Sequence, residues 1–113
     1  MWGTAPPEPF ASEVDVWTAA QHLERAIHAP SASAARFWLL RAEAQIDHAA
    51  VYQQTYGQIP LADRARQVAS ALHQLAHATG LQSAQALPVW QAGPLYAFQG
   101  VLSALATALQ RGG

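Results

Sequence analysis

A chain of 113 residues is long enough for one domain with its own core and too short for two. Its net charge of −1, without a basic run, gives no electrostatic footprint for nucleic acid, and the absence of cysteine excludes disulfides and thiolate chemistry. The N-terminus has neither the basic start nor the apolar segment of a signal peptide. We therefore expect a cytoplasmic protein with no nucleic-acid partner and no membrane partner. Lysine and asparagine are absent, a bias associated with GC-rich bacterial genomes.

The first predicted helix follows an extended arm, residues 1–11, which contains three prolines. Ser12 is expected to cap this helix, because Asp15 follows three residues later as in a capping box. Ala29 precedes Pro30, and the residue before a proline avoids the helical conformation, so the helix should end there. Its apolar stripe has helical spacing and consists of Val16, Ala20, Leu23 and Ile27.

The second predicted helix begins near Ser31 or Ser33 and ends at Tyr56, before Gly57, which readily adopts the left-handed conformation that stops a helix. It is apolar on two sides, so we expect partners on both sides and a central place in the fold. A charge at Leu40 should then be severely destabilising. One apolar side consists of Phe37, Leu40, Ala44 and Val51. The other consists of Leu39, Ala42, Ile46, Ala49 and Ala50. The aromatic residues of this helix either pack in the core or line a flat ligand pocket, and the sequence leaves both roles possible. They are Trp38, Tyr52 and Tyr56.

Pro60 opens the third predicted helix and Gly80 ends it, with an apolar seam that alternates by four and three residues. This seam consists of Leu61, Ala65, Val68, Leu72, Leu75 and Thr79. A short helical turn is expected after Ser83, then a loop that presents Trp90, and residues 93–94 begin the last helix. The inward face of that helix consists of Leu95, Phe98, Leu102, Leu105 and Leu109. The pattern predicts an all-α, up-and-down four-helix bundle over residues 12–111, with a short extra helical turn before the last helix.

The last helix has an uncharged outer side, because no charged residue occurs between Gln67 and Gln110. Small residues recur there at steps of three and four, which would let two helix backbones approach closely. The predicted interface consists of Ala97, Gly100, Ala104, Ala108 and Trp90. The alternative is an alanine-rich face that is exposed to water, and a membrane span is disfavoured because the helix is short and partly polar.

Histidines provide a second candidate site. His73 and His77 are four residues apart, so both rings lie on one side of a helix. With His48 in the preceding helix, their order resembles the three-histidine site of the DinB/YfiT-like bundles, a resemblance that rests on these three residues and implies a bound metal ion. Solvated histidines are the simpler interpretation, because the sequence shows no carboxylate partners that would orient them.

The second predicted helix carries a narrow polar strip along its length, which consists of Arg36, Glu43 and Asp47. Paired carboxylates can bind metal or act as acid and base, but the chain has no Glu-x-x-His motif, so ion pairs with Arg64 or Arg66 are the alternative. Nucleophile elbows and phosphate-binding loops are absent from the sequence.

We therefore predict a non-enzymatic helical interaction module without a cofactor. It would act by forming a homodimer or by docking a protein partner through the uncharged C-terminal helix. The alternative is a small metal- or ligand-binding bundle that uses His48, His73 and His77.

Overall fold

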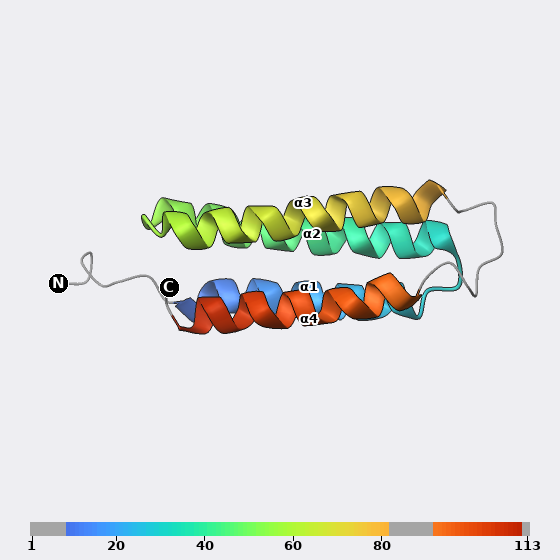
Figure 1. The fold of residues 1–113 in the computed structure, drawn as a ribbon, viewed down its shortest axis with the longest axis horizontal. Coiled ribbons are helices and arrows are strands. Elements are labelled where there is room, and N and C mark those ends of the chain that lie inside the picture. Colours follow the sequence, from blue (N-terminus) through green and yellow to red (C-terminus); the bar gives the residue numbers. More distant parts are fainter. Residues whose placement is uncertain (1–8, 82–91, 112–113) are drawn as a thin grey trace.

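The computed structural model describes residues 9–81 and 92–111, and all regular secondary structure within these ranges is helical. The elements are α1 (Pro9–Ile27), α2 (Ala32–Thr55), α3 (Ile59–Leu81) and α4 (Ala92–Gln110). Successive helices run in opposite directions and form two layers, α2 with α3 and α1 with α4 (Figure 1). The predicted all-α four-helix bundle is confirmed, while the extra helical turn after Ser83 lies outside the described residues.

The ends of α2 follow from local backbone chemistry. Ser31 has an extended backbone (φ −149°, ψ 160°), and its hydroxyl accepts the N–H of Ala34 at 3.0 Å, as an N-cap residue does. At the other end Gly57 has a φ of +80°, a conformation that costs glycine little. The N–H of Gln58 donates to the carbonyl of Gln53 at 2.8 Å, which completes a Schellman motif.

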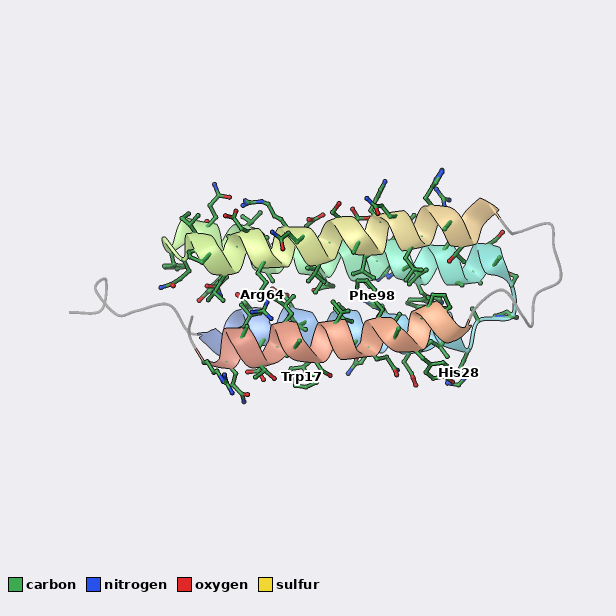
Figure 2. All side chains as sticks on the ribbon, in the orientation of Figure 1. Trp17, His28, Arg64 and Phe98 are labelled. Carbon is green, nitrogen blue, oxygen red and sulfur yellow. The ribbon has the colours of Figure 1, made fainter. Side chains whose placement is uncertain are left out.

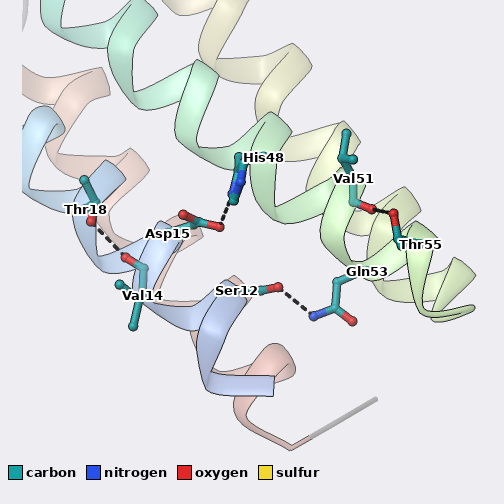
Figure 3. A network of polar contacts seen from close by, with 8 residues as sticks. All are labelled: Ser12, Val14, Asp15, Thr18, His48, Val51, Gln53 and Thr55. Carbon is teal, nitrogen blue, oxygen red and sulfur yellow. Dashed lines mark hydrogen bonds and ion pairs between the residues drawn. The ribbon is translucent and has the colours of Figure 1, made fainter. Parts of the chain in front are cut away.

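The predicted start of α1 at Ser12 is wrong, because the helix begins at Pro9. Residues 9–11, predicted as the end of the arm, therefore belong to α1, and residues 1–8 lie outside the described ranges. Ser12 is fully buried, and its hydroxyl accepts a hydrogen bond from the Gln53 amide of α2 at 2.9 Å (Figure 3). The hydroxyl joins two helices and is not a cap.

The helices occupy the corners of a square in which α2 contacts α1 and α3, and α1 contacts α2 and α4. The contact between α3 and α4 is much narrower than the other three. A pocket of about 470 Å³ lies where the beginning of α3 faces the end of α4, and Arg64 points from α3 toward α4 there (Figure 2). α4 is therefore held mainly by α1.

The core combines small and large side chains from different helices. α2 contributes mainly buried alanines together with two large apolar residues, whereas α4 contributes four leucines that are about 1% exposed or less. Small residues opposite large ones let the layers interdigitate without voids. The buried residues of α2 are Ala32, Ala35, Leu39, Ala42, Ile46, Ala49, Ala50 and Gln53. The buried leucines of α4 are Leu95, Leu102, Leu105 and Leu109.

The second apolar side predicted for α2 does not pack against a helix. Phe37 is 52% exposed, Val51 is 58% exposed, Ala44 is exposed, and Leu40 is only partly buried at the edge of the core. In a square of four helices each helix has one inward stripe and two flanks, so the side opposite the stripe faces solvent. The contacts of α2 with its two neighbours lie on either flank of a single buried stripe.

Candidate functional site

The outer face of α4 is uncharged and carries exposed apolar residues. Tyr96 is 50% exposed and Val101 is 41% exposed, and Ala97, Gly100 and Ala104 are exposed as well. Ala108, also predicted for this interface, is instead partly buried against the core. The last predicted interface residue, Trp90, lies outside the described ranges.

Gly100 lies in the interior of α4, where glycine is less favourable than alanine by about 1 kcal/mol. A Cβ atom built on Gly100 would meet nothing within 4 Å. No close approach within the described part of the chain therefore requires a glycine at this position.

The three histidines of the proposed metal site are not brought together. His48 Nδ1 lies 2.7 Å from Asp15 Oδ2 of α1 (Figure 3), whereas His73 Nδ1 lies 3.0 Å from Glu43 Oε1, at the contact between α2 and α3. His48 therefore lies on the flank of α2 that faces α1, whereas His73 of α3 contacts the opposite flank of α2, and His77 is exposed. Within the described ranges no group of three or more His, Asp or Glu side chains is arranged to hold a metal ion.

The polar strip of α2 lines an open groove against α3. The groove has a volume of about 430 Å³, and Glu43, Asp47, Arg66 and His73 line it. Burial, and then the neighbouring carboxylate of Glu43, raise the pKa of Asp47. Of the two arginines predicted to pair with this strip, Arg66 lies close enough to oppose that shift. The direct partners of Arg66 are Asp63, at 3.7 Å, and the side-chain oxygen of Gln54.

A cluster of rings and guanidinium groups spans α1 and α2, and nothing in the sequence pattern indicated it. The rings of His22 and Trp38 stack with their centres 5.4 Å apart, and the rings of Phe37 and Trp38 form a T-shaped pair with centres 5.2 Å apart. The guanidinium of Arg25 lies 5.0 Å from the centre of the Trp38 ring, and that of Arg41 lies 5.6 Å from the same centre. We call these five residues the aromatic–arginine cluster.

His22 supplies the titratable ring of this cluster. Burial lowers the pKa of its imidazole, and the charges of Arg41 and Arg25 lower it further. Its Nδ1 atom is buried without a hydrogen-bond partner in the described structure. The imidazole is therefore neutral near pH 7, because protonation would place a third positive charge beside two guanidinium groups.

Sequence reasoning missed the cluster because its members come from two helices. His22 and Arg25 share one side of α1 by their spacing of three residues, and Trp38 and Arg41 share one side of α2 in the same way. Only the rotation of each helix about its axis determines whether these pairs face each other.

No family model, curated protein or solved structure matches this chain. Among the helices of residues 9–81 and 92–111, none has the length and apolar character that a membrane span requires.

Proposed function

We propose that the chain is a non-enzymatic helical interaction module that forms a homodimer through the outer face of α4. The observation that carries this proposal is the composition of that face. α4 has no Asp, Glu, Lys or Arg, yet it exposes Tyr96 and Val101 beside Ala97, Gly100 and Ala104. Helices on the surface of a monomer usually place charge toward solvent, and contiguous apolar surface usually indicates an interaction site.

Gly100 supports a close contact with another chain. Its helix-weakening effect is not offset by any close packing in the described structure. A glycine flanked by alanines one turn away would let two helix backbones approach more closely than larger side chains allow. A two-fold axis would place this surface against its own copy.

The expected dimer is weak. The 19 residues of α4 span about 28 Å, so one helix face of about 10 Å width offers roughly 300 Å² per chain. Stable interfaces commonly bury about 800 Å² per partner. Trp17 of α1 extends the surface, because it is 51% exposed and projects from the α1/α4 layer away from α2 and α3 (Figure 2). Covering the exposed half of Tyr96 or Trp17 removes about 100 Å² from water, which is worth about 2.5 kcal/mol per ring.

Sedimentation velocity over a range of concentrations tests this proposal. The wild type should show a dimer fraction that grows with concentration, and Ala104→Glu should be monomeric because two like charges would meet near the two-fold axis. Ala44→Glu is the matched control, since it makes the same change at an exposed alanine in the middle of another helix, α2. A wild type that is monomeric at all concentrations refutes the proposal. Loss of the dimer in Ala44→Glu but not in Ala104→Glu also refutes it, because the contact would then lie on α2.

Gly100→Ala provides a second test that separates association from folding. The substitution should raise the melting temperature of the monomer, because alanine favours the helix by about 1 kcal/mol. The same methyl group should weaken the dimer if two backbones approach at this position. A Gly100→Ala variant that dimerises as well as the wild type would rule out close backbone contact at this residue.

A further inference from the structure

The aromatic–arginine cluster carries two positive charges without acidic partners in the described part of the chain. No carboxylate there lies within ion-pair distance of Arg25 or Arg41. Glu24, the neighbour of Arg25 in sequence, is directed elsewhere: its carboxylate lies 3.6 Å from His28 and 3.3 Å from the amide of Gln99 in α4. The region is therefore locally cationic in a chain whose net charge is −1.

The Trp38 ring holds both guanidinium groups in place. Arg25 approaches it from α1 and Arg41 from α2, and Arg41 also lies 5.5 Å from the centre of the Phe37 ring. An arginine that stacks on a ring keeps its N–H groups in the plane of the guanidinium, where they stay available for hydrogen bonds. Both side chains are exposed, so these N–H groups face water. Because stacking already restricts both side chains, less conformational entropy is lost when they bind an anion.

The neighbouring ring offers an apolar surface beside this charge. Phe37 is 52% exposed, although it makes a T-shaped contact with Trp38 and Arg41 lies over its ring. Exposed aromatic rings next to arginine are the surfaces on which proteins stack nucleobases. Two guanidinium groups are, in turn, suited to a phosphate group, because each can donate two parallel hydrogen bonds to its oxygens.

We infer that the aromatic–arginine cluster is a binding site for a nucleotide, in which Arg25 and Arg41 hold the phosphate and Phe37 stacks against the base. The imidazole of His22, on α1, stacks against the Trp38 ring and supports it. This site lies on the contact between α1 and α2, apart from the face of α4 proposed for association, and it does not depend on that proposal.

Isothermal titration calorimetry with adenosine 5′-monophosphate tests the inference. Ribose 5-phosphate and adenosine serve as probes of the two halves of the ligand. We expect the monophosphate to bind more tightly than either. Arg25→Gln and Arg41→Gln should each weaken its binding by about tenfold or more, since charged hydrogen bonds are worth about 1.5–3 kcal/mol.

Arg36→Gln is the matched control, because it removes the same charge from an exposed arginine of α2 that makes none of the ring contacts of the cluster. It should bind the monophosphate like the wild type. Phe37→Leu should weaken the binding of the monophosphate and leave the affinity for ribose 5-phosphate unchanged. Circular dichroism of each variant should match the wild type, because all four residues are exposed.

Three results would overturn the inference. The first is no heat of binding with the monophosphate at millimolar concentration. The second is an equal loss of affinity in Arg36→Gln, which would indicate general attraction to positive charge. The third is equal binding of ribose 5-phosphate and the monophosphate with no effect of Phe37→Leu, which would show that the site does not recognise a base.

Discussion

The hydrogen bond between Ser12 and Gln53 joins α1 to α2 inside the core. Ser12 is 0% exposed and Gln53 is 2% exposed, and the amide of Gln53 donates to the serine hydroxyl at 2.9 Å. Ser12→Ala removes the acceptor and leaves the buried amide without it. We expect the free energy of unfolding to fall by about 1–3 kcal/mol, the usual cost of a buried polar group that loses its partner. For a domain of about 100 residues this lowers the melting temperature by about 4 °C or more.

A double-mutant cycle measures whether the pair itself is responsible. Gln53→Met keeps the length of the side chain and removes its polar atoms, so in the double variant no buried amide remains unpaired. Ser12→Ala/Gln53→Met should therefore be more stable than the sum of the two single changes predicts. Urea unfolding followed by circular dichroism gives the four free energies. Ser70→Ala, at an exposed position of α3, should change stability by less than about 0.5 kcal/mol. Equal effects of Ser12→Ala and Ser70→Ala, or strict additivity in the cycle, would refute this reasoning.

Three further predictions concern the core and the titratable groups. Leu39→Ala should cost about 2–5 kcal/mol because Leu39 is 0% exposed, whereas Leu40→Ala should cost less than half as much, as urea unfolding would show. Burial and Glu43 raise the pKa of Asp47, so the native state keeps this proton to a higher pH than the unfolded chain. The charged carboxylate is therefore destabilising at neutral pH. Asp47→Asn should raise the melting temperature at pH 7, but it should not do so at pH values below 3.8, the ordinary pKa of the group. The pKa of His22 is lowered in the native state, so the unfolded chain binds this proton at a higher pH than the native chain does. The free energy of unfolding should therefore decrease as the pH falls below 6.5. The melting temperature of His22→Gln should depend less on pH in that range, and an equal dependence in both proteins would contradict the assignment.

Much of the fold could be predicted because several helices have strong contrast between their faces. Leu102, Leu105 and Leu109 recur with helical spacing on α4, and all three are buried. The ends of α2 were predictable for a local reason, since Ser31 and Gly57 act on backbone groups within a few residues. Signals of this kind need no knowledge of the neighbouring helices.

The outer side of α2 could not be predicted, because alanine gives little contrast. Ala42 is fully buried and Ala44 is exposed, although both are alanines and their residue type does not distinguish them. Where both sides of a helix contain alanine, the large residues decide the apparent stripe, and Phe37 and Val51 suggested a second buried side. Tertiary packing decided otherwise. Ser12 was misassigned for a related reason, since its partner is 41 residues away.

The two proposed surfaces share α1, and their independence is the last prediction. His22 and Arg25 face α2 across one side of α1, whereas Glu24 reaches Gln99 of α4 on another. α2 and α4 lie at opposite corners of the bundle and contact each other through neither surface. Binding at one surface should therefore leave the other unchanged.

The monomeric variant Ala104→Glu should bind adenosine 5′-monophosphate with an affinity within about twofold of the wild type, and Arg41→Gln should dimerise as the wild type does. Thermodynamic linkage makes this a strict test, because a nucleotide that strengthens the dimer must bind the dimer more tightly by the same factor. Calorimetry of Ala104→Glu measures the affinity of the monomer for the nucleotide. Sedimentation of the wild type with and without the monophosphate measures the effect of the nucleotide on dimerisation. A tenfold change in either would show that α1 couples the surfaces. The first positions to substitute would then be the adjacent residues Glu24, which contacts α4, and Arg25, which belongs to the cluster.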